Sequence, residues 1–171
     1  MTGKQGLTNI LKTTAGSAEC KSVTFAGTVA SSSASSITAT PSFSECTCLG
    51  VLCTADVNEC DYLLKIDAES LGTVDIACPA GKEITLTASK CTIHIPPQTG
   101  VGTISYQEIG TGTTREIELG LNLAGIHYAH TEGTGIGKCS TGTGTNGTLA
   151  GTATMTGEGD PGSGHVGAWA E

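Results

Sequence analysis

The amino-acid sequence predicts an all-β protein, an antiparallel β-sandwich or flattened barrel of about nine to eleven short strands held by disulfides. Glycine accounts for 25 of the 171 residues, and Thr, Val and Ile are plentiful while helix formers are scarce. That composition favours strands joined by turns. Turn signals recur about every 8–12 residues, as in sandwiches and barrels. The eight cysteines are even in number and spread over most of the chain, as in a disulfide framework.

The length predicts one domain, or two at most. We expect residues 20–171 to form a single β-sandwich domain, preceded by an N-terminal segment at 1–19. Within that segment "LTNILKT" fits either a strand or a short helix.

The strands are predicted from apolar side chains that recur at every second position. In "KSVTFAGTV" the residues Val23, Phe25 and Val29 share one face, and polar residues fill the other. Side chains of a strand alternate between its faces, so this period indicates half-buried strands. The expected strands lie at 21–29, 37–44, 60–70, 72–79, 82–89, 91–97, 102–110, 115–130, 147–159 and 165–171. Pro41 restricts its strand to an edge or a bulge.

The charge balance argues against two classes of partner. The net charge is −8, from 16 acidic and 8 basic residues, with no cluster of Lys and Arg. Phosphate neutralisation on nucleic acid requires such a cluster. No apolar run approaches the roughly 18 residues that span a bilayer. We therefore expect neither nucleic-acid binding nor a membrane span.

The spacing of the cysteines argues against metal and redox chemistry. Structural zinc sites use repeated C-x2-C or similar pairs, and thioredoxin-like centres use C-x-x-C. No C-x2-C occurs in this chain. Disulfides form in oxidising compartments, so we expect an extracellular or cell-surface protein. The chain carries no leader, so either a leader was removed and Met1 is an expression start, or the protein is made without one.

Local bracketing predicts the pairing, although eight cysteines allow many alternatives. Cys78 and Cys91 bracket a turn, a strand and a second turn, and Cys46 and Cys60 bracket one loop. Within that loop a smaller ring could be closed around Gly50. The predicted pairs are Cys48–Cys53 nested inside Cys46–Cys60, Cys78–Cys91, and Cys20–Cys139.

Two arrangements suggest catalysis. Ser163 lies two residues before His165 in a Gly-rich stretch, for which a hairpin turn is the simpler interpretation. Glu116 and Glu118 share one strand face, as an acid and base for glycoside cleavage could. Sugar sites usually present aromatic platforms, but Trp169 is the one tryptophan. An exposed polar face is the preferred interpretation of the two glutamates.

Metal sites are also weakly indicated. His127 and His130 lie three apart and would face opposite sides of a strand, while His94 falls on a polar face. Glu158 and Asp160 lack the regular spacing of a calcium loop. The sequon at Asn146 also fits a hairpin turn with Asn-Gly at its tip, which we prefer. We expect no cofactor, no metal and no catalytic centre.

From about Cys20 onward the chain resembles small secreted cysteine-rich β-proteins of unknown function from actinobacteria. The matching pieces include "AECKSVTFAGT", "NECDYLLKI", "CPAGKEITLTASKCTIHIPPQTG", "GIHYAHTEGTG" and "GHVGAWAE". The resemblance implies an extracellular, disulfide-stapled β-protein with a cleaved leader. It implies that Cys48 and Cys53 are additions to the family's pattern, most simply bonded to each other. It carries over no activity.

The expected function is that of a secreted structural or adhesive domain, such as a subunit of a filament or other surface assembly. Gly- and Thr-rich strands with few charges offer uncharged edges and faces for pairing with copies of the chain or with other extracellular proteins. The first alternative is a small-ligand or carbohydrate-binding module, with a glycan as the partner. The second is a hydrolase that uses Glu116 or Glu118.

Overall fold

The computed structural model describes residues 1–6, 8–28, 35–68, 71–89, 91–132, 139–158 and 165–166. It is all-β, with one short 3-10 helix, η1 (Gly112–Thr114), among these residues. The strands are β1 (Thr2–Gln5), β2 (Asn9–Thr13), β3 (Gly16–Thr28), β4 (Ser36–Cys48), β5 (Val51–Asp56), β6 (Asp61–Ala68), β7 (Leu71–Ala77), β8 (Ile84–Ala88), β9 (Cys91–Ile95), β10 (Thr103–Ile109), β11 (Glu116–Glu132), β12 (Gly142–Glu158) and β13 (His165–Val166).

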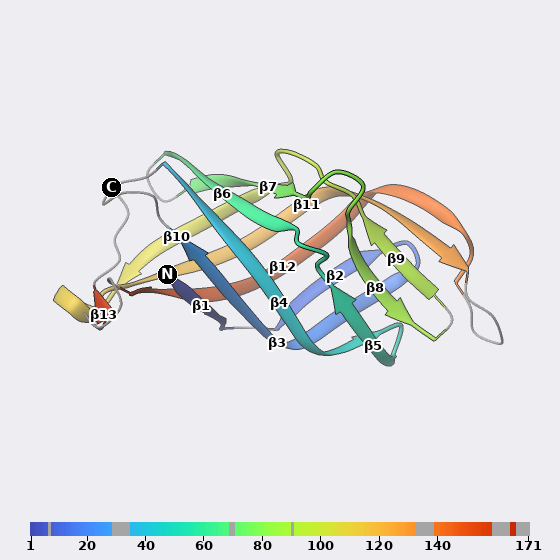
Figure 1. Ribbon diagram of the computed structural model, residues 1–171, viewed down its shortest axis with the longest axis horizontal. Helices are drawn as coiled ribbons and strands as arrows, with labels where there is room; N and C mark the ends of the chain where they lie inside the picture. Colours follow the sequence, from blue (N-terminus) through green and yellow to red (C-terminus); the bar gives the residue numbers. More distant parts are fainter. Residues whose placement is uncertain are drawn as a thin grey trace.

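The antiparallel sheet closes on itself (Figure 1). Four strands, β3, β4, β11 and β12, run 13 to 17 residues without a break. The other places in the wall are each filled by two shorter strands. β1 and β2 both pair with β12 and β3, β5 and β6 both pair with β4, and β9 and β10 both pair with β11. In the next place β7 pairs with β6, and β8 pairs with β5. Of the two predicted architectures, this pairing is that of the flattened barrel, with longer strands than expected.

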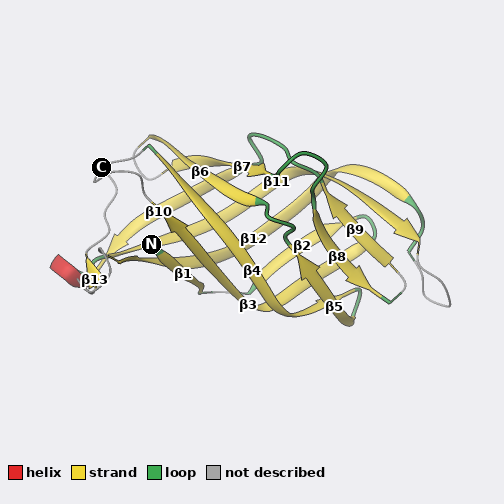
Figure 2. Ribbon diagram, in the orientation of Figure 1, coloured by secondary structure: helices red, strands yellow, loops and turns green. Residues whose placement is uncertain are grey.

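The chain passes up and down around the barrel, so its turns alternate between the two ends (Figure 2). One end carries the β2–β3 and β4–β5 turns, together with the last residues of β8 and β11. We call it the stapled end, because three of the four disulfides lie in that half of the barrel. The other end, where β7 begins and η1 lies, is called the opposite end.

Apolar side chains fill the interior. In β11 the inward residues Ile117, Leu119, Leu121 and Leu123 are buried and alternate with more exposed polar residues, as predicted. A register shift next to Gly125 lets the inward set continue in the second half of the strand. Those further buried residues are Ile126, Tyr128 and His130. Small barrels of about eight strands have an interior that side chains can fill, as these buried residues do here.

The structure decides between the two alternatives for the N-terminal segment and corrects two other local predictions. Residues 2–5 and 9–13 are strands, so the strand alternative holds for the N-terminal segment. Residues 51–56, expected within a loop, form β5. The hairpin predicted at Asn146 is wrong. β12 continues through it, with a register shift against β11, because β11 extends far enough to pair with Gly142.

An acidic side chain holds the β9–β10 connection against the outside of β7. Asp75 lies in β7 and is 7% exposed. Its Oδ1 accepts a hydrogen bond from the backbone N–H of Gly100 at 2.8 Å. Its Oδ2 lies 2.6 Å from Nζ of Lys65 in the neighbouring β6. The hydrogen bond from Lys65, then that from Gly100, lowers the pKa of the Asp75 carboxyl against the opposing effect of burial.

The lowered pKa predicts a loss of stability in acid. A carboxyl with a folded pKa below its unfolded value of about 3.9 stabilises the protein above that value, and the contribution disappears as the pH falls through the folded pKa. We therefore expect the free energy of unfolding to drop below about pH 4, and Asp75→Asn to remove part of that dependence. Urea unfolding from pH 2 to pH 7 measures both. An unchanged pH dependence in Asp75→Asn would contradict the assignment.

Candidate functional site

All eight cysteines are paired. The bonds are Cys20–Cys46, Cys48–Cys53, Cys60–Cys78 and Cys91–Cys139. The predicted Cys48–Cys53 bond is confirmed. The predicted Cys46–Cys60, Cys78–Cys91 and Cys20–Cys139 bonds are wrong. Several disulfides of this kind are typical of proteins from oxidising compartments.

The wrong pairs share one cause, which is that bracketing in sequence ignored the strands between the cysteines. β5 lies between Cys46 and Cys60, and Cys46 instead faces Cys20 directly in the β3–β4 ladder, with Cα atoms 4.0 Å apart. β8 separates Cys78 from Cys91, which pairs with the far end of that strand. Cys78 therefore bonds to Cys60, and this bond joins the β5–β6 and β7–β8 breaks.

The β4–β5 hairpin forms a stiff apolar projection at the stapled end. Its two turn residues, Leu49 and Gly50, have φ of 55° and 78°, the positive values that a tight two-residue hairpin requires. The Leu49 side chain packs beside Gly16, and its N–H donates to the carbonyl of Ser17 at 2.9 Å. The next two residues, Val51 and Leu52, are 50% and 82% exposed.

We call residues 48–53 the contact tip. The Cys48–Cys53 bond closes its six residues into a ring, so the chain loses little further freedom when the tip is covered. Exposed apolar side chains on a rigid projection are suited to contact with another surface. The sequence predicted the stapled ring but not which of its side chains face solvent.

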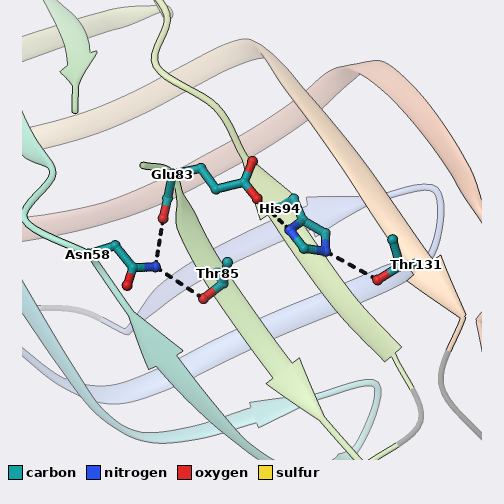
Figure 3. Close-up of polar contacts among 5 residues, drawn as sticks. All are labelled: Asn58, Glu83, Thr85, His94 and Thr131. Atoms are coloured by element: carbon teal, nitrogen blue, oxygen red, sulfur yellow. Dashed lines mark hydrogen bonds and ion pairs between the residues drawn. The ribbon is translucent and has the colours of Figure 1, made fainter. Parts of the chain in front are cut away.

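A hydrogen-bonded chain of three side chains lies on the outer face of the barrel, where β8, β9 and β11 are neighbours (Figure 3). Nδ1 of His94 in β9 lies 2.6 Å from Oε1 of Glu83, and Nε2 lies 3.1 Å from Oγ1 of Thr131 in β11. The glutamate precedes β8, which pairs with β9, while β9 pairs with β11. The three residues therefore come together only through the sheet.

The three residues are connected as in a catalytic triad, with His94 as the base, Glu83 as the group that orients it and Thr131 as the hydroxyl. In the tautomer that carries the proton on Nδ1, the carboxylate of Glu83 accepts from Nδ1–H, and Nε2 is then the acceptor for the Thr131 hydroxyl. Such a chain can increase the nucleophilicity of a hydroxyl. It also ties three strands together. The two described cavities lie on the other side of the wall, inside the barrel.

Glu116 and Glu118 lie on the outer face of β11, as predicted, since Ile117 and Leu119 between and beside them point inward. Nε2 of Gln107 in β10 donates to Oε1 of Glu118 at 3.2 Å. The two glutamates are thus part of a polar outer face of the sheet.

The remaining predicted residues are dispersed. His127 is exposed while His130 is buried, so the two face opposite sides as expected. The His130 ring stacks on Tyr128, with centroids 5.9 Å apart. Glu158 ends β12 and His165 begins β13, while Asp160, Ser163 and Trp169 lie outside the described residues. Within the described ranges no group of three or more His, Cys, Asp or Glu is placed to hold a metal ion.

Comparison of the chain with protein-family models, with curated proteins and with solved structures finds no match. The part of the chain that the structure describes has no helix long and apolar enough to cross a membrane.

Proposed function

We propose that the protein is an extracellular structural or adhesive domain whose copies join end to end. The observation that carries this proposal is the contact tip, a disulfide-closed hairpin that exposes Val51 and Leu52. The four disulfides, and the resemblance to secreted actinobacterial proteins, support an extracellular location.

The second half of the contact lies at the opposite end of the barrel. Leu71, the first residue of β7, is 53% exposed. β4 runs from the neighbourhood of this residue to the contact tip, and its 13 residues span about 40 Å. Figure 1 shows the β4–β5 turn and the start of β7 towards opposite ends of the long axis. A contact between two different surfaces repeats without closing and builds a filament.

The closed sheet changes the route of assembly that the sequence suggested. Each place in the wall pairs with both neighbours over at least part of its length, so addition of a strand along a free edge is not the simplest contact. The ends of the barrel present the large apolar side chains instead. A glycan or small molecule as the partner remains the alternative prediction.

Charge placed at either end should stop assembly. We expect the wild type to form concentration-dependent polymers in sedimentation velocity and negative-stain microscopy, and both Leu52→Asp and Leu71→Asp to be monomeric. Because each variant keeps one intact half of the contact, an equimolar mixture should form dimers and nothing longer. Thr54→Asp, at an exposed position of β5 beside the tip, is the charge-matched control and should polymerise normally.

Two outcomes would contradict the proposal. A wild type that stays monomeric at every concentration removes self-assembly. Assembly that is lost in Leu52→Asp but kept in Leu71→Asp indicates a symmetric tip-to-tip dimer, which closes and builds no filament.

A further inference from the structure

The barrel wall has a gap between β4 and the β5–β6 break. Among the described pairings, β4 pairs with β5 only through residues 46–48 and with β6 only through residues 36–39. The rest of β5 pairs with β8. Residues 40–45 of β4 therefore have β3 on one side and no strand partner on the other. Pro41, which has no N–H to donate, occupies this stretch at no cost to the ladder.

Phe43 lies in this unpaired stretch, and its side chain faces the interior. The residue is half-buried, packs against the core and lines a cavity of about 30 Å³ inside the barrel. Other residues of the cavity wall are Asn9, Leu11, Tyr62, Leu86 and Leu149. A second cavity of about 10 Å³ lies on the far side of Tyr62, which lines both.

Asn9 contributes a buried polar group to this otherwise apolar wall. It is 5% exposed, and its Nδ2 has no hydrogen-bond partner. Gly151 in β12 leaves the space that the amide occupies, since a Cβ at that position would lie 2.1 Å from Oδ1 of Asn9. Folded proteins seldom leave a buried donor unpaired, because its lost hydration is then not replaced.

We propose that the cavity behind Phe43 binds a small, neutral, largely apolar molecule whose hydrogen-bond acceptor pairs with Nδ2 of Asn9. The apolar lining favours a hydrocarbon body. The lining holds no charged side chain, which favours a carbonyl over a carboxylate. Barrels of about eight strands have room for one small ligand. This site is separate from the contact tip and does not depend on the proposed assembly.

The size of the cavity limits the ligand and gives Phe43 its role. A cavity of roughly 150 Å³ admits benzene, and a single water needs about 10–15 Å³. At 30 Å³ the closed site holds little more than a water, so a short aliphatic carbonyl enters only when the Phe43 ring turns outward through the gap. Water is the competing occupant. It needs two to four polar partners, whereas few polar side chains line this cavity.

The test follows the side-chain NH₂ resonances of Asn9 in a ¹⁵N-labelled protein during titration with 2-pentanone. We expect a saturable shift of these resonances and a higher thermal midpoint. Asn9→Leu, which replaces the amide with an apolar group of similar size, lacks these resonances. Its affinity is therefore taken from the rise of the thermal midpoint with 2-pentanone concentration, and should fall at least about tenfold. Phe43→Ala should bind 2-heptanone, which the wild type binds more weakly. Leu52→Ser, at the contact tip, is the matched control and should bind 2-pentanone as the wild type does.

Three results would overturn the proposal. The first is the absence of a saturable shift in the wild type. The second is equal 2-pentanone affinity in wild type and Asn9→Leu, which would show that the amide is not the donor. The third is a nuclear Overhauser contact between the Asn9 amide and a bound water that persists at saturating 2-pentanone. The wild-type titration decides the question even if Asn9→Leu fails to fold.

Discussion

Replacing Cys91 and Cys139 together by serine lowers the free energy of unfolding by about 4 kcal/mol in the chain-entropy account of disulfides. This bond joins residues 48 apart in sequence, the largest separation of the four, so its loss frees the longest loop of the unfolded chain. Both sulfurs are also buried, and the bond fixes the segment before β12 to the start of β9. Urea unfolding under non-reducing conditions measures the change.

The double variant Cys48→Ser/Cys53→Ser is the matched control. Its bond spans a sequence separation of 5, for which the same account gives about 2 kcal/mol. The test is therefore the ratio of the losses in the free energy of unfolding of the two double variants. Equal losses would show that loop closure in the unfolded state does not set the contribution of these bonds, and that local packing around each sulfur does.

The sequence predicts those strands whose inward residues are large and apolar. β8, β9 and the first half of β11 alternate plainly, because Ile84, Ile93 and Leu119 point inward between polar neighbours. β5 was missed because the alternation is carried by small residues. Its inward positions are Cys53 and Ala55, while its largest side chains, Val51 and Leu52, face solvent at the tip.

The same reasoning explains the ambiguous N-terminal segment. In β2 the inward positions include Asn9 and Leu11, so a polar residue interrupts the apolar period and leaves strand and helix equally compatible with the pattern. A residue that breaks a local rule while buried is one for which a functional reason should be sought. Here that residue lines the interior cavity.

Contacts between distant strands could not be predicted from the sequence. Glu83, His94 and Thr131 are separated by 11 and 37 residues, and only the pairing of β8 with β9 and of β9 with β11 brings them together. The disulfide connectivity failed for the same reason. The number of cysteines indicated four bonds, whereas the partners depend on which strands are neighbours.

The β9–β10 break supplies a prediction with a large effect, because the chain there passes very close to β11. Gly102 has φ of 72°, and a Cβ on it would lie 2.5 Å from Cα of Leu123 and 2.6 Å from the backbone nitrogen of Ala124. Backbone atoms in a paired strand cannot move aside as a side chain can. We expect Gly102→Ala to cost about 3–4 kcal/mol, from the unfavourable φ together with the overlap.

Gly100 separates these two causes. It also has a positive φ, 65°, but a Cβ there would meet nothing within 4 Å, and its N–H to Asp75 is kept in alanine. Gly100→Ala should therefore cost only the conformational term, about 1–2 kcal/mol. Urea unfolding of the two variants side by side gives the difference. Equal losses in the free energy of unfolding for Gly100→Ala and Gly102→Ala would contradict this explanation. They would show that the positive φ, and not the close approach of the chain to β11, is what requires glycine at residue 102.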